Sequence, residues 1–73
     1  MNQVHKQLGR VRASRRLTQH ELAVRLQLLG WSQCDRFTIS KIELDTRRVT
    51  DIELAWLATA LEVTADELLG LER

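Results

Sequence analysis

Two histidines and one cysteine are the first side chains to consider as general bases, metal ligands or nucleophiles. His5 and His20 lie on different predicted helices, with no cysteine or carboxylate at a ligand spacing beside them. A metal site needs converging ligands, and a nucleophilic cysteine needs an adjacent base, which the sequence does not place near Cys34. There is also no glycine-rich phosphate loop. The sequence therefore predicts neither an enzyme nor a metal or cofactor site.

Basic side chains are the remaining candidates, and they are concentrated in the first two thirds of the chain. Residues 1–48 carry ten Lys or Arg and four Asp or Glu, a net charge of +6. Residues 49–73 carry one base and six acids, a net charge of −5. A basic face on a small domain indicates a polyanionic partner, although helices also carry charges that are merely solvated. The acidic C-terminal part is a possible contact for a protein partner.

Length and composition limit the other functions of the chain. Its 73 residues fit one domain, residues 1–73, and 44% are hydrophobic, which is typical of a folded globular chain. So small a core leaves little room for a cavity of ~300 Å3, the lower end for ligand sites. No stretch approaches the ~18 apolar residues of a membrane span, and the first residues lack the apolar segment of a signal peptide. With Cys34 as the single cysteine, we expect a cytoplasmic protein without a membrane partner.

The hydrophobic pattern is that of helices, without strand signals. Val4, Leu8 and Val11 form one apolar face, which predicts a helix over residues 2–15. Three later helices begin with a Thr-x-x-Glu pattern, at residues 18–21, 50–53 and 64–67. In this pattern the Thr hydroxyl accepts from the backbone N–H three residues on, and the Glu accepts from the backbone N–H of the Thr. With one further helix before residue 50, five helices are predicted.

Each later helix has an inward apolar face. The helix that begins near residue 18 is expected to end at Gly30, with Trp31 folded back on Leu26. The next helix can take either Ser32 or Asp35 as its N-cap. The residues expected to point inward are Leu22, Ala23, Leu26 and Leu29, then Ile39 and Ile42, then Leu54, Leu57, Ala58 and Leu61, and finally Leu68 and Leu69.

Two short strings resemble a known family. Residues 17–23 read L-T-Q-H-E-L-A and residues 38–43 read T-I-S-K-I-E. They are similar to the two halves of the helix-turn-helix in phage-repressor/Cro-type proteins, the XRE family, and the resemblance covers about residues 4–70. It implies an all-α, five-helix lambda-repressor-like bundle that binds double-stranded DNA. The first helix of the pair would lie on the phosphate backbone and the second would enter the major groove. It further implies a transcriptional regulator, a repressor, that acts as a homodimer.

The resemblance and the helical spacing together give roles to residues of this helix pair. Gln19, at the start of the first helix, is a candidate phosphate clamp, with a merely solvated side chain as the alternative. On the second helix, Arg36, Phe37, Ser40 and Lys41 occupy the outward face. Arg36 and Lys41 can donate to guanine O6 and N7, and Ser40 can serve a base or a phosphate.

Four further residues complete the expected DNA site. Phe37 either contacts a thymine methyl group or packs inward against Trp31. Thr38 is expected to touch a phosphate or to stabilise its helix. Arg47 and Arg48, in the loop that follows, are expected along the DNA backbone, and a merely solvated loop is the alternative.

The spacing between the two strings departs from the family pattern. Eleven residues separate Leu26 from Thr38, several more than the family has, and Gln27 stands where a Gly is usual. We therefore expect a lengthened first helix or an enlarged turn, anchored by Trp31. Such a turn can add a DNA contact of its own, for example through Gln33.

The resemblance also implies an internal ion pair. Arg12 matches a family Arg that pairs with the Glu of the second string, which is Glu43 here. We expect a partly buried pair that connects the first helix to the end of the third. The alternative is two separate surface charges.

A second function from a different class is a protein-interaction module, such as the antitoxin of a toxin–antitoxin pair. In that case the acidic residues after position 48, together with Trp56, would bind the partner. Trp56 lies just beside the apolar stripe of its helix, so it either packs on the core or forms an oligomer contact.

Overall fold

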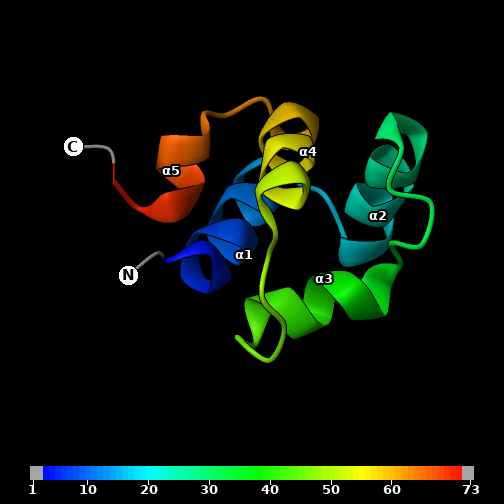
Figure 1. Cartoon of the computed structure of the whole chain (residues 1–73), viewed down its shortest axis with the longest axis horizontal. Helices are drawn as coiled ribbons and strands as arrows, with labels where there is room; N and C mark the ends of the chain where they lie inside the picture. The colour runs from blue at the N-terminus through cyan, green and yellow to red at the C-terminus, as the bar shows by residue number, and fades with distance from the viewer. Residues whose placement is uncertain (1–2, 72–73) are drawn as a thin grey trace.

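The computed structural model describes residues 3–71, and these residues form five α-helices without a strand (Figure 1). The helices are α1 (Val4–Ser14), α2 (Gln19–Leu29), α3 (Arg36–Glu43), α4 (Asp51–Leu61) and α5 (Ala65–Leu69). The predicted all-α fold with five helices is confirmed for this part of the chain. The first helix is shorter than the predicted range of 2–15, because it begins at Val4 and Arg15 is its C-cap. Residue 2 lies outside the described residues.

Side-chain caps fix where the helices begin, as the sequence predicts. The hydroxyls of Thr18, Thr50 and Thr64 accept from the backbone N–H groups of the Glu residues three positions on. The Glu carboxylates at the first two sites accept in return from the backbone N–H of the Thr, which completes two capping boxes. For α3 the cap is Asp35 and not Ser32, since Asp35 accepts from the Thr38 N–H at 2.9 Å. These hydrogen bonds from Thr38 hold the pKa of Asp35 below its ordinary value.

One apolar core joins all five helices. Its fully buried side chains are Leu8, Leu22, Leu26, Cys34, Ile39, Ile42, Leu57, Leu61 and Leu68. α3 packs against α1 and α2, while α5 packs against α1 and α4, and α4 also packs against α2. Figure 1 shows α3 along the lower edge of the view, beneath α1, α4 and α2, so that one long side of α3 faces away from the bundle.

The connection between α2 and α3 is enlarged and closely packed. α2 continues to Leu29, and Gly30, with a φ of +123°, turns the chain. The Trp31 N–H then donates to the Leu26 carbonyl and the Gly30 N–H to the Gln27 carbonyl, which is the hydrogen-bond pattern of a Schellman stop. Both the lengthened helix and the enlarged turn that the sequence offered as alternatives are therefore present.

Trp31 and Cys34 anchor this connection in the core. Trp31 is buried and stacks on Trp56 of α4, with ring centroids 5.7 Å apart. The side-chain amide of Gln27 donates to the Cys34 carbonyl at 2.6 Å. Leu29, which the sequence places in the core, is instead 40% exposed. The reason is that Trp31 folds back onto the end of α2 and fills the core at that level.

Candidate nucleic-acid interface

The outward side of α3 carries the residues that the sequence assigns to DNA. Ile39 and Ile42 are buried against the core, whereas Arg36, Phe37 and Lys41 are exposed. Ser40 is half-buried between the two sides. At about 100° per residue, Phe37 and Lys41 lie opposite the buried isoleucines. α3 therefore presents two cations and an aromatic ring on a face that no other helix of the described chain covers.

Phe37 lies on the outside of the molecule and does not pack against Trp31. Its side chain is 59% exposed, so the inward alternative is wrong. The Arg36 guanidinium lies over the Phe37 ring, 5.0 Å from its centroid, a cation–π contact. Phe37 points outward because the burial of Ile39 and Ile42 fixes the inward side of α3, and Phe37 lies on the opposite side of the helix.

Thr38 stabilises its helix, which is one of the two roles that the sequence allows. It occupies the third position of α3 and forms a capping box with Asp35. Its backbone N–H donates to Asp35 Oδ1, and its hydroxyl accepts from the Asp35 N–H at 3.4 Å. With these hydrogen bonds Thr38 fixes the start of α3, where Arg36 and Phe37 project.

The expected Arg12–Glu43 pair is present and connects α1 to the last residue of α3. Arg12 Nε donates to Glu43 Oε2 at 2.7 Å, and Nη2 donates to Oε1 at 3.1 Å. The two side chains are 19% and 15% exposed. A third guanidinium nitrogen, Nη1, donates to the Leu17 carbonyl at 2.8 Å. Gly9 of α1 lies close to this pair, since a Cβ there would be in van der Waals contact with Glu43 Oε1 at 3.4 Å.

Gln19 belongs to the same network, so it is not a merely solvated residue. It is the first residue of α2, and its Nε2 donates to Glu43 Oε1 at 3.1 Å. Glu43 thereby holds the Gln19 amide between the start of α2 and the end of α3. An amide group has a second N–H, which leaves a donor for a phosphate at the N-terminus of α2.

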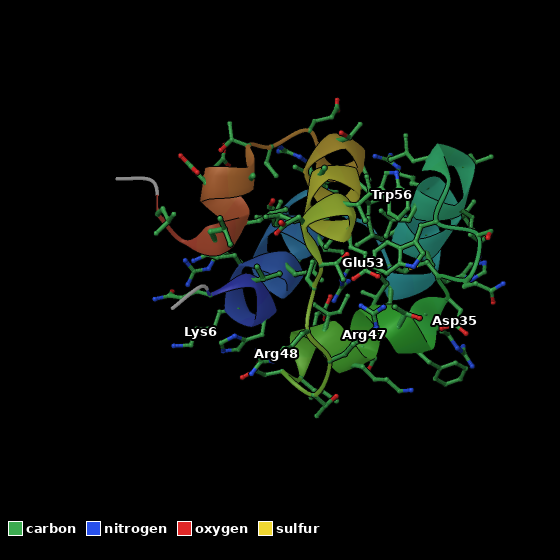
Figure 2. The ribbon with its side chains drawn as sticks, in the orientation of Figure 1. Lys6, Asp35, Arg47, Arg48, Glu53 and Trp56 are labelled. Carbon is green, nitrogen blue, oxygen red and sulfur yellow. The ribbon has the colours of Figure 1, made fainter. Side chains whose placement is uncertain are left out.

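Arg47 differs from the expectation for the loop after α3. Its guanidinium donates two hydrogen bonds of 2.8 Å to the Glu53 carboxylate and lies 5.4 Å from the Trp31 ring centroid. Figure 2 shows Arg47 between α3 and the start of α4, next to Glu53. A bidentate pair of this kind uses two of the five guanidinium N–H donors and directs the side chain toward α4. Of the two loop arginines, Arg48 is the exposed one and the candidate for the DNA backbone.

Glu53 is the residue of this region that sequence analysis missed. The only signal is its place as the Glu of a capping box, which does not indicate an ion pair. Glu53 is 8% exposed and accepts from Arg47 and from the Thr50 backbone N–H. These hydrogen bonds, first of all those from Arg47, hold the pKa of Glu53 below its ordinary value. The pair ties the loop after α3 to α4 and, through Trp31, to the enlarged turn.

A surface hollow lies between the start of α1 and the loop after α3. Its volume is about 430 Å3, and it is open to solvent rather than an enclosed pocket. His5, Asp45 and Arg48 are among its lining residues, and His5 Nδ1 is 3.8 Å from Asp45 Oδ1. In Figure 2, Lys6 and Arg48 both lie at the lower side of the view, where α1 approaches α3. These bases extend the positive surface of α3 toward α1.

Three further features of the described residues concern a reactive thiol, a metal site and a membrane span. Burial raises the pKa of the Cys34 thiol to about 11, so the thiol stays protonated at neutral pH. Within residues 3–71 no three His, Cys, Asp or Glu side chains converge as metal ligands. No helix in that range has the length and apolar character to span a membrane.

Comparison with known protein families, with curated proteins and with solved structures finds no match to this chain.

Proposed function

We propose that this protein binds double-stranded DNA sequence-specifically, as a small transcriptional regulator of the phage-repressor/Cro type that acts as a repressor in the cytoplasm. In this proposal α3 lies in the major groove and the start of α2 lies on the phosphate backbone. The observation that carries it is the uncovered side of α3, where Lys41 is exposed opposite the buried isoleucines and Arg36 is exposed at the start of the helix. The resemblance of residues 17–23 and 38–43 to the helix-turn-helix strings supports the same arrangement.

Contacts within the helix pair support this geometry. A helix that reads bases must be held rigidly, because base contacts depend on register and orientation. α3 is capped by Asp35 at one end and tied by Glu43 to Arg12 and Gln19 at the other. Gln19, the first residue of α2, is hydrogen-bonded to Glu43 at the end of α3, and a helix N-terminus is suited to binding a phosphate.

A homodimer is part of the proposal because one α3 reads only a few base pairs, and two-fold symmetric operators are read by two-fold symmetric proteins.

The test of the proposed function is a selection from a pool of random duplexes with the purified protein. We expect an enriched motif with two inverted half-sites. Recovery of unenriched sequences after several rounds would contradict sequence-specific binding.

The alternative, a protein-interaction module such as an antitoxin, has an observation in its favour. Leu28 on α2 and Ile52 on α4 are 84% and 58% exposed, and the chain after residue 48 is acidic. A protein that aggregates alone and becomes soluble on co-expression with a partner would favour this function. A stable dimer in solution that enriches a DNA motif would favour the regulator.

A further inference from the structure

Phe37, the second residue of α3, points along the centre line of the side of α3 that no other helix covers. At about 100° per residue it lies opposite the midpoint between Ile39 and Ile42, which are 0% and 1% exposed. Leu44 follows seven residues later on the same side and is 70% exposed. The face proposed to meet DNA therefore carries apolar side chains along its centre, with Lys41 between them. In the major groove, the apolar group that such a side chain can contact is the C5 methyl of a pyrimidine.

Arg36 is positioned by Phe37. The central carbon of the Arg36 guanidinium lies over the ring, 5.0 Å from its centroid, and within residues 3–71 the guanidinium forms no ion pair. A cation–π contact uses none of the guanidinium N–H donors for a hydrogen bond. Those donors match the O6 and N7 acceptors of guanine. A separation of 5.0 Å lets the two groups address adjoining base pairs, which lie about 3.4 Å apart along the duplex.

We propose that Arg36 and Phe37 act as one reading unit for a guanine next to a pyrimidine that carries a C5 methyl group, with Phe37 as the residue that determines specificity for the methyl. The proposal rests on the proposed function, since it requires α3 in the major groove. Thymine and 5-methylcytosine share the C5 methyl group. They differ in the major-groove group beside it, which is the O4 acceptor in thymine and the N4 amino donor in cytosine. The contact between Arg36 and Phe37 is already formed in the free protein, so the two side chains lose little conformational freedom when they bind DNA.

The test uses the duplex motif enriched by selection and varies one base at a time. Each thymine is replaced by deoxyuridine, which removes only the methyl group. At one position we expect a three- to fivefold rise in Kd, the size given by burial of about one methyl group. In a second arm, cytosine and then 5-methylcytosine replace that thymine, and the methylated base is expected to recover part of the affinity. Tighter binding of 5-methylcytosine than of thymine would assign the unit to methylated DNA, and the reverse order to thymine.

Variants of the protein connect the effect to the two residues. Phe37→Ala is expected to bind the thymine and deoxyuridine duplexes equally. Arg36→Ala is expected to lose sensitivity to replacement of the neighbouring guanine by 7-deazaguanine, which lacks N7. Leu28→Ala is the matched control, because Leu28 is an exposed apolar residue near the end of α2, outside the proposed reading helix. Circular dichroism establishes that each variant is folded.

Two kinds of failure are distinguishable. Equal affinity for thymine and deoxyuridine at every position, or methyl sensitivity that persists in Phe37→Ala, overturns the inference while sequence-specific DNA binding stands. Unchanged DNA binding by Phe37→Ala would also overturn it, and would favour a protein contact for the exposed ring. Failure to enrich any motif refutes the proposed function and the inference with it.

Discussion

Removal of the Glu43 charge is expected to destabilise the protein strongly. Glu43 accepts from Arg12 Nε, Arg12 Nη2 and Gln19 Nε2, and its side chain is only 15% exposed. In Glu43→Gln the Arg12 guanidinium keeps its bond to the Leu17 carbonyl but loses its anionic partner in a site where it is 19% exposed. Breaking a buried pair in this way costs about 3 kcal/mol, the lower end of the range for such pairs.

The loss is large for a protein of this size. At the usual stability per residue, a chain of 73 residues unfolds with about 4–11 kcal/mol. A loss of about 3 kcal/mol corresponds to a fall in Tm of about 12–24 °C. The assay is urea unfolding at pH 7, followed by the fluorescence of Trp31 and Trp56, which stack on each other in the folded state.

Two comparisons isolate the ion pair from other effects. Arg10→Ala removes an exposed base of the same helix and is expected to change the free energy of unfolding by less than about 0.5 kcal/mol. The double variant Arg12→Met/Glu43→Gln is expected to be more stable than the sum of the two single losses predicts, since it leaves no unpaired charge. A Glu43→Gln loss as small as that of Arg10→Ala would refute the reasoning and identify the pair as surface charges.

Three further predictions concern the turn, the loop and the salt dependence. Because the hydrogen bonds from Arg47 lower the Glu53 pKa, Glu53 contributes stability that is present above its ordinary value of 4.5 and is lost as pH falls through the lowered pKa. Glu53→Gln should therefore flatten the fall of the urea midpoint below about pH 5, and an unchanged acid profile would contradict the pair. Gly30→Ala should cost about 1–2 kcal/mol, because a Cβ at a φ of +123° is strained, and unaltered stability would argue against this turn. Arg48→Ala should reduce the slope of log K against log salt by ~1, whereas Arg47→Ala should mainly lower stability, and equal slopes for the two variants would contradict their different roles.

The features that sequence predicted best are local ones. A Thr hydroxyl reaches only the N–H groups of its own first turn, so Thr18, Thr50 and Thr64 fix helix starts wherever those helices pack. Gly30 ends α2 for a similar reason, since few other residues adopt its φ. The Arg12–Glu43 pair is long-range, and it was expected only because the two strings resemble a family in which such a pair occurs.

The features that sequence analysis missed depend on tertiary packing around the enlarged turn. The sequence predicts that Trp31 folds back on Leu26, but it does not reveal that Leu29, on the same apolar stripe, is then left 40% exposed. Arg47 looks like any loop cation in the sequence, because its partner Glu53 is recruited by the path of the loop over α4. No periodicity or capping rule encodes that path.

The most direct test of the account is a titration of Lys41→Ala against its enriched duplex and a scrambled duplex at several salt concentrations. Lys41 is exposed on the outward side of α3 and makes no hydrogen bond with its side chain among residues 3–71, so its removal should leave folding intact. If α3 reads bases, the variant loses ~1–3 kcal/mol on the enriched duplex, and its ratio of cognate to scrambled affinity falls. An unchanged ratio, with both duplexes weakened alike, would contradict the assignment of α3 as the reading helix.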